Sequence, residues 1–272
     1  MKYPISATLS LPPVGAGESA ASVGALRFLK AQGFDGADLS TYFLDLSDWR
    51  RTYEEVAAAR EEAGLPLLGC HLPFYGSREA LDRNMYAAID LCAALKIPSA
   101  VIHPPGLTKP ARGFDAKREF EEAYAYLAPY RDYAEGRGLP LAVENMRVAP
   151  SVRLARRFCQ SAEELLSLAE ALDTGVCWDT GHANISGCDQ ESSLARLGRR
   201  LLWVHINDNT GMDDDHLPPF AGNVDFAAVS RGLDKAGYTG AFNYEIATSR
   251  MPASLRAPLG AYLVAAAEEI LK

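Results

Sequence analysis

Short apolar runs alternate with longer amphipathic stretches along the whole chain. The apolar runs are typical of buried strands, and the stretches between them repeat apolar positions every three or four residues, as helices do. Eight runs are predicted as strands, at residues 5–9, 36–39, 66–71, 100–103, 140–144, 176–178, 201–205 and 241–245. Each is followed by a predicted helix, at about residues 19–31, 48–63, 77–95, 115–135, 161–171, 190–197, 226–236 and 253–271.

Local signals mark several of these helix ends. Gly33 and Gly64 follow predicted helices, and Ser161 with Glu164 three residues later forms a capping box. Continuously apolar strands separated by helices predict a parallel sheet covered on both faces, and eight such units predict an α/β fold, a closed (β/α)8 TIM barrel. We expect one domain over residues 1–272. An open doubly wound sheet is the alternative, disfavoured because no GxGxxG phosphate loop follows the first strand.

Polar residues gather at the carboxyl ends of the predicted strands. In a barrel these ends meet on one face, where active sites lie. The strand ends and the residues just beyond them include all five histidines, two Glu and two Asp: His71, His103, Glu144, Asp179, His182, His205, Asp214, His216 and Glu245. One histidine at such a place is usually structural, but the whole set is hard to explain by packing. Mixed carboxylates and imidazoles favour a divalent metal ion such as Mn, Co, Zn or Mg.

Composition narrows the classes of partner. The net charge of −8 and the pI of about 5.2 disfavour a broad electrostatic grip on nucleic acid or an anionic membrane. No apolar run has the length of a membrane span, and residues 1–6 lack a signal-peptide pattern, so we expect a cytoplasmic protein. Five scattered cysteines without a CxxC pair are predicted to be reduced.

Four motifs together resemble the xylose isomerase-like TIM-barrel superfamily, which holds sugar isomerases, ketose 3-epimerases and zinc-dependent apurinic-site endonucleases. The motifs are Val143-Glu-Asn145, Trp178-Asp-Thr-Gly-His-Ala-Asn184, Val204-His-Ile-Asn-Asp208 and Tyr244-Glu-Ile246. The resemblance implies one divalent metal held by Glu144, Asp179, His205 and Glu245. It also implies that Glu144 and Glu245 are the catalytic acid/base pair and that His182 contacts the substrate.

We expect further substrate contacts from His71, His103, Trp178 and Asn145. The function that the resemblance implies is a metal-dependent isomerase or epimerase of a sugar, sugar phosphate or polyol, acting by proton transfer through a metal-stabilised enediolate. The expected partner is a small sugar or sugar phosphate, and no membrane partner is expected. A homo-oligomer is left open.

The alternative is an apurinic-site endonuclease with three zinc ions. The nuclease ligand pattern has further matches at His71, His103, His182, Asp214 and His216, so these are candidate additional metal ligands. The net negative charge and the lack of basic clusters outside residues 147–157 disfavour the endonuclease function and a nucleic-acid partner. Both stay open as alternatives. A metal-binding barrel without catalysis is the third class.

The sequence departs from the patterns of known family members at two places, one bearing on the substrate and one on the mechanism. Residues 207–212, Asn-Asp-Asn-Thr-Gly-Met, replace an arginine-containing segment that is usual in ketose 3-epimerases, so their substrate does not transfer to this chain. The lysine expected near the metal of xylose isomerases proper is not evident after Glu144, which disfavours a hydride shift.

Overall fold

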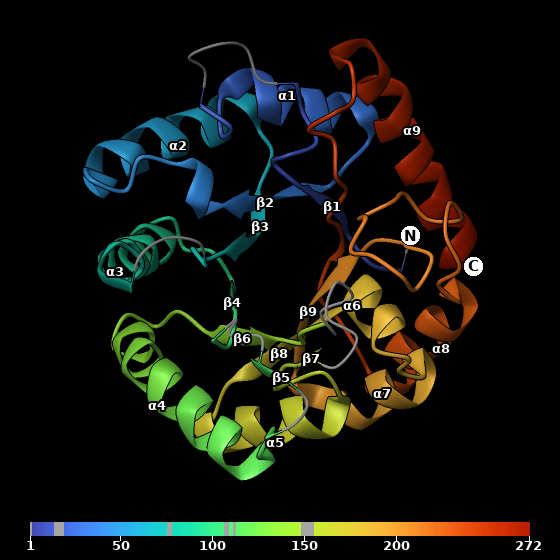
Figure 1. Ribbon diagram of the computed structural model, residues 1–272. Coiled ribbons are helices and arrows are strands. Elements are labelled where there is room, and N and C mark those ends of the chain that lie inside the picture. Colours follow the sequence, from blue (N-terminus) through green and yellow to red (C-terminus); the bar gives the residue numbers. More distant parts are fainter. Residues whose placement is uncertain (1, 14–18, 75–77, 106–108, 111–112, 148–154) are drawn as a thin grey trace. The chain divides into compact units, whose positions relative to one another are not determined.

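Eight parallel strands close into a barrel in the computed structural model, which describes residues 2–13, 19–74, 78–105, 109–110, 113–147 and 155–272 (Figure 1). Their order around the barrel is β1-β10-β9-β8-β6-β4-β3-β2. The strands are β1 (Ile5–Thr8), β2 (Gly36–Ser40), β3 (Leu67–His71), β4 (Ala100–Ile102), β6 (Leu141–Glu144), β8 (Gly175–Asp179), β9 (Leu201–Ile206) and β10 (Phe242–Tyr244). The predicted (β/α)8 fold is confirmed, and each predicted strand agrees with the observed one to within one residue at either end.

The predicted helices are all present among the described residues. They are α1 (Val23–Gln32), α2 (Trp49–Ala63), α3 (Arg78–Ala94), α4 (Ala116–Glu135), α5 (Ala162–Leu172), α7 (Gln190–Leu197), α8 (Phe226–Ala236) and α9 (Ala253–Ile270). The helix-end signals act as expected: Gly33 and Gly64 adopt left-handed backbone conformations, and the Ser161 side chain accepts a hydrogen bond from the backbone N–H of Glu164.

Several short elements were not predicted. They are α6 (Thr180–Ile185), the 3-10 turns η1 (Thr41–Phe43) and η2 (Gly198–Arg200), and an antiparallel pair formed by β5 (Lys109–Pro110) and β7 (Ala155–Arg156). Each is too short to show a periodic apolar pattern in the sequence.

The chain divides into two compact units, and the sequence prediction of one domain stays a prediction. Unit 1 comprises residues 1–100, 133–140 and 240–272, with α1, α2, α3 and α9 around β1, β2, β3 and β10 (Figure 1). Its strands carry buried polar pairs: the Ser6 hydroxyl donates to Oδ1 of Asn243 at 2.8 Å, and the Thr8 hydroxyl donates to Oδ2 of Asp38 at 3.2 Å. Apolar residues such as Leu26 and Leu29 pack α1 into the core.

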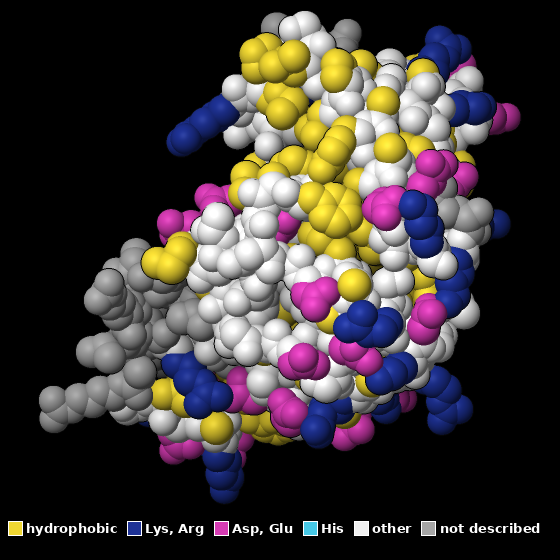
Figure 2. Space-filling model, turned by 90° about the vertical axis from the view of Figure 1, so that its right-hand side faces the viewer, with side chains coloured by type: hydrophobic (Ala, Val, Ile, Leu, Met, Phe, Trp, Pro, Cys, Tyr) yellow, Lys and Arg dark blue, Asp and Glu magenta, His cyan; other side chains and the backbone are white. Residues whose placement is uncertain are grey.

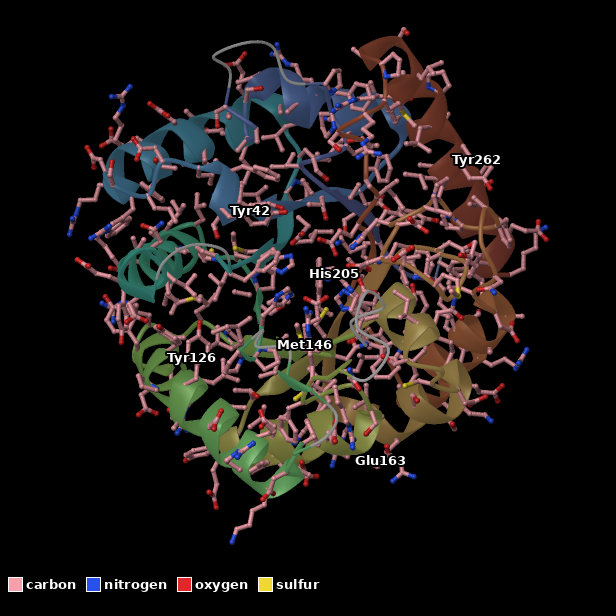
Figure 3. The ribbon with its side chains drawn as sticks, in the orientation of Figure 1. Tyr42, Tyr126, Met146, Glu163, His205 and Tyr262 are labelled. Atoms are coloured by element: carbon pink, nitrogen blue, oxygen red, sulfur yellow. The ribbon has the colours of Figure 1, made fainter. Side chains whose placement is uncertain are left out.

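Unit 2 comprises residues 101–132 and 141–239 and carries β6, β8 and β9 with α5 to α8. Close helix packing here depends on Gly232 of α8, because a Cβ at that position would lie 2.8 Å from Cβ of Leu194 on α7. Figure 3 shows His205 of β9 and Met146, which follows β6, on the inner side of these strands, whereas Glu163 of α5 points outward.

No helix among the described residues combines the length and the apolar character required to cross a membrane. Figure 2 shows acidic and basic side chains interspersed on the face that it displays.

Candidate metal centre

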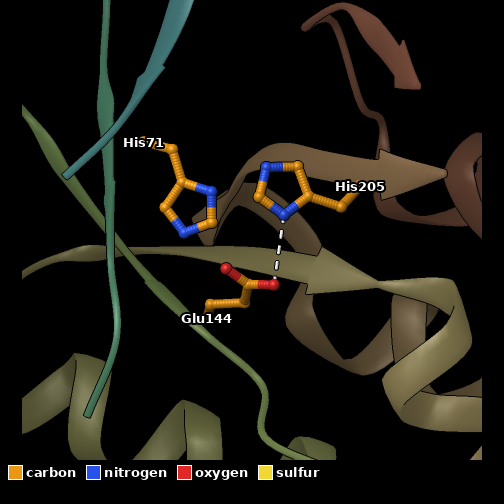
Figure 4. Close-up of side chains that lie close together, drawn as sticks. All are labelled: His71, Glu144 and His205. Atoms are coloured by element: carbon orange, nitrogen blue, oxygen red, sulfur yellow. Dashed lines mark hydrogen bonds and ion pairs between the residues drawn. The ribbon is translucent and has the colours of Figure 1, made fainter. Parts of the chain in front are cut away.

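Glu144, the last residue of β6, lies at the centre of the polar residues of unit 2. Its carboxylate is fully buried and accepts hydrogen bonds from two histidine rings. Oε2 lies 2.7 Å from Nε2 of His103, and Oε1 lies 3.1 Å from Nδ1 of His205 (Figure 4). The two oxygens of the Glu144 carboxylate thus each contact a different histidine ring.

The neighbouring histidine rings together affect the pKa of Glu144 more strongly than its burial does. Burial alone would raise the pKa of the carboxyl group, because the charged form loses its water. The rings of His205 and His103 act in the opposite direction and hold the pKa of Glu144 well below its usual range. The side chain is therefore a carboxylate at neutral pH, available as a metal ligand or a base.

Asp179 ends β8 and caps the first turn of α6. Its Oδ1 accepts a hydrogen bond from the backbone N–H of His182 at 2.7 Å, and its Oδ2 accepts one from the side-chain amide of Asn207 at 2.7 Å. The amide of Asn145 binds the Asp179 backbone on both sides, accepting from its N–H at 2.6 Å and donating to its carbonyl at 3.1 Å. Asp179 is buried and is held in place from three directions.

His182 projects from α6 toward the same group of residues. Its Nδ1 lies 2.8 Å from the carbonyl oxygen of Asn145, so Nδ1 carries a proton and Nε2 faces Asp214 at 3.6 Å. Burial by itself would lower the pKa of this imidazole. The carboxylates of Asp179, Asp214 and Glu144 outweigh burial and raise the pKa of His182 to about 9.

Asp214 and His216 lie in the loop between β9 and α8. Asp214 accepts a hydrogen bond from Nε of Arg147 at 2.8 Å through Oδ2, and its Oδ1 lies 3.4 Å from Nε2 of His216. Burial alone would raise the pKa of Asp214, but its contacts with His182 and His216 hold the pKa well below its usual range.

Among the described residues of unit 2, two groups have the geometry of metal ligands. Glu144, Asp179 and His205 each offer one ligand atom, and these atoms lie within 4.8 Å of one another. The same holds for His182, Asp214 and His216, which we call the His182–Asp214–His216 cluster. The buried carboxylates of the first group are the oxygen donors that divalent ions such as Mn²⁺ and Mg²⁺ prefer, and the imidazole adds affinity for Zn²⁺ or Co²⁺.

The predicted residues of unit 1 also come together. His71 ends β3, and its Nδ1 lies 3.6 Å from Oε1 of Glu245, which follows β10. The His71 ring stacks on Phe74 with ring centres 5.3 Å apart, and Tyr42 contacts it edge-on. The ring is therefore held by aromatic neighbours and by a carboxylate.

Two residues that were predicted to bind substrate form hydrogen bonds with other parts of the protein instead. Trp178 is fully buried, and its indole N–H donates to Oε1 of Gln190 on α7 at 2.9 Å, so the ring packs between β8 and this helix. Asn145 uses both ends of its amide on the Asp179 backbone. We therefore leave Trp178 out of the proposed site and treat Asn145 as a positioning residue.

Sequence reasoning missed Asn207, Gly181 and the pairing of Arg147 with Asp214. A Cβ on Gly181 would lie 1.9 Å from Oδ1 of Asn207, so only glycine lets that amide reach Asp179. The one available signal was position: Gly181 and Asn207 each lie two residues after a predicted ligand, Asp179 and His205.

Comparisons with known proteins agree on one family. The model of the family described as xylose isomerase-like TIM barrel matches residues 26–268. The uncharacterized protein y4fM of Sinorhizobium fredii is 31% identical over 163 residues, which cover 60% of this chain and 51% of y4fM. The match thus spans about half the length of that relative.

Solved structures agree with the barrel architecture. A xylose isomerase domain protein from Alicyclobacillus acidocaldarius superposes with a TM-score of 0.77 at 22% identity, covering 98% of both chains. A D-allulose 3-epimerase from a Methylomonas species, solved with D-allulose, has a TM-score of 0.74 at 17% identity, covering 98% of this chain and 97% of that one. At these identities the likeness is one of fold.

Proposed function

Because the chain belongs to the xylose isomerase-like TIM-barrel family, we propose that it is a divalent-metal-dependent isomerase or epimerase of a sugar, a sugar phosphate or a polyol. The observation that carries the proposal is the buried group of Glu144, Asp179 and His205, whose ligand atoms lie within 4.8 Å of one another. Two buried carboxylates and an imidazole at this spacing form a donor set that suits a divalent ion, which supports a metal site.

The proposed metal ligands are Glu144, Asp179, His205 and Glu245. The first three fit the ion by donor type, burial and mutual distance. Glu245 is included because the family resemblance of Tyr244-Glu-Ile246 implies it. The contacts of Asn145 and Asn207 with Asp179 would support the site, as outer partners of metal ligands usually do.

Proton transfer in this proposal belongs to Glu144 and Glu245. A bound divalent ion would supply Lewis-acid chemistry, polarising a substrate carbonyl. One glutamate then removes the proton from the carbon beside that carbonyl, and the other returns a proton to the opposite face or to the neighbouring carbon. The low pKa of Glu144 keeps it ionised, the form in which a carboxylate binds a metal ion. His182 would hydrogen-bond a substrate oxygen.

The substrate class rests on the family and on structural neighbours. A neighbour of the same fold was solved with D-allulose, which makes ketoses the first compounds to test. We do not assign the sugar, because residues 207–212 differ from the arginine-containing segment that is usual in ketose 3-epimerases.

The test is exchange of substrate C–H protons with solvent. The protein, loaded with Mn²⁺ or Co²⁺, is incubated in D₂O with a panel of ketoses and their phosphates, and deuterium incorporation is followed by NMR. We expect Glu245→Gln to lose at least about 100-fold in exchange rate while its melting temperature stays near that of the parent, because an amide cannot accept the proton. Glu268→Gln, on the exposed surface of α9, is the matched control. Full exchange in Glu245→Gln would remove that residue from the mechanism.

An apurinic-site endonuclease is the second candidate function. The His182–Asp214–His216 cluster favours it, since that function calls for more than one metal. The net charge of −8 counts against binding a duplex. Incision of a duplex with a single abasic site, in the presence of Zn²⁺, would support the nuclease, and exchange without incision would support the isomerase.

A further inference from the structure

The His182–Asp214–His216 cluster has the spacing of a metal site. Nε2 of His182 lies 3.6 Å from Oδ2 of Asp214, and Nε2 of His216 lies 3.4 Å from Oδ1. Tetrahedral zinc, with ligands at roughly 2.0 to 2.1 Å, places ligand atoms roughly 3.4 Å apart. The carbonyl of Asn145 holds the proton on Nδ1 of His182, which is the usual outer contact of a histidine ligand.

A fixed positive charge is already present at this cluster. Nε of Arg147 donates to Oδ2 of Asp214 at 2.8 Å, the same oxygen that faces His182. Both side chains are mostly buried, at 25% and 20% exposed, so water screens the pair only in part. A guanidinium keeps its charge at any physiological pH and pairs tightly with carboxylates.

Arg147 reaches Asp214 from a different part of the chain. It lies three residues after Glu144, on the segment that follows β6, whereas Asp214 belongs to the loop between β9 and α8. The residue that places a cation beside Asp214 is therefore attached to the strand that carries the central carboxylate of the metal centre.

We propose that Arg147 is a built-in cation that keeps the His182–Asp214–His216 cluster from binding a divalent ion, so that the protein works with one metal. The inference rests on the proposed function, in which Glu144, Asp179 and His205 hold that metal. Two effects act together. The guanidinium repels an incoming divalent ion across a short distance, and it competes with the ion for Oδ2, one of the two carboxylate oxygens of Asp214. Arg147 thereby selects between the one-metal and multi-metal chemistries for which this chain has ligands.

The experiment counts zinc ions per chain. Full-length protein is incubated with excess Zn²⁺, desalted and analysed for zinc and protein content. We expect about one equivalent for the parent and about two for Arg147→Gln, because neutral glutamine removes the competing charge. Adding Asp214→Asn to Arg147→Gln is expected to return the count to about one, because the carboxylate ligand is lost. Arg156→Gln, whose guanidinium pairs with Glu164 instead, is the control and should bind as the parent does.

Two further variants keep the outcome decisive. Arg147→Met is a second neutral substitution should Arg147→Gln not fold, and Arg147→Lys keeps a positive charge and is expected to stay near one equivalent. Equal zinc counts in the parent and in both neutral variants, or a second tightly held zinc in the parent, would overturn the role of Arg147. Failure of the proposed metal centre is seen separately, because Asp179→Asn should remove the first equivalent from the parent.

Discussion

The side chain of Asn145 connects two residues of the candidate site. Its amide holds the Asp179 backbone on both sides, and its backbone carbonyl accepts from Nδ1 of His182. The sequence predicted Asn145 as a substrate contact. Its observed hydrogen bonds instead leave the amide engaged with the protein, so its influence on catalysis would pass through the placement of Asp179 and His182.

The ionisation of His182 makes the stability of the metal-free protein depend on pH. Its pKa in the folded chain is raised to about 9, from 6.5, so the folded state binds this proton more tightly than the unfolded state. The contribution is complete below about pH 6.5 and is lost as the pH rises through about 9, and it amounts to roughly 3 kcal/mol at most. Glu144 has a lowered pKa and titrates below this window.

This dependence is measured by urea unfolding of the metal-free protein between about pH 6 and pH 9.5, for the parent and for His182→Gln. We expect the stability difference in favour of the parent to fall by up to about 3 kcal/mol across the range. A difference that stays constant with pH would show that His182 does not hold its proton in the folded protein.

The short helix α6 sets the geometry of one side of the site. Asp179 caps it, and the Thr180 hydroxyl donates to the carbonyl of Asn207 at 2.7 Å. Gly181 lets Asn207 and Asn209 approach closely, because a Cβ there would lie 1.9 Å from Oδ1 of Asn207 and 2.8 Å from Nδ2 of Asn209. The helix and the segment after β9 therefore form one packed layer around Asp179.

Gly181→Ala is expected to break this layer. The added methyl must displace Asn207, whose amide donates to Asp179, and the cost is roughly 3 kcal/mol of unfolding free energy. Thermal or urea unfolding measures it, and metal affinity should weaken with it by about tenfold or more. Gly24→Ala in α1 is the control, because a Cβ at Gly24 meets nothing closer than 3.8 Å and alanine favours helix. Equal stability of Gly181→Ala and Gly24→Ala would contradict the account of α6.

At the scale of the whole molecule, bound metal is expected to raise thermal stability. An ion at about one hundred times its dissociation constant adds roughly 2.7 kcal/mol to the folded state, which for a chain of this size is a shift in Tm of roughly 5 to 10 °C. Chelation followed by readdition of Mn²⁺, Co²⁺ or Zn²⁺ tests this by calorimetry. Asp179→Asn should abolish the shift, whereas Asp189→Asn, at the exposed cap of α7, should leave it intact. A shift that survives in Asp179→Asn would place the metal elsewhere.

The alternation of apolar runs and amphipathic stretches was enough to predict the barrel. Each strand is buried on both faces and each helix on one, so burial imposes the period that the sequence displays. The same logic identified the strand-end residues, because parallel strands in a barrel bring their carboxyl ends to one face. Glu144, Asp179 and His205 were candidates from the sequence for this reason, and the structure places them together.

Only the tertiary structure decided what these side chains contact. Whether Trp178 faces a helix or the barrel interior depends on the pleat of β8, and the pairing of Arg147 with Asp214 joins residues far apart in the chain. Neither contact has a period or a spacing that a sequence can display, because side-chain direction and loop placement depend on packing against distant elements. The sequence alone thus determined which residues are available for chemistry, and the tertiary structure decided which of them lie together, which side chains hold them in place and which charge lies beside them.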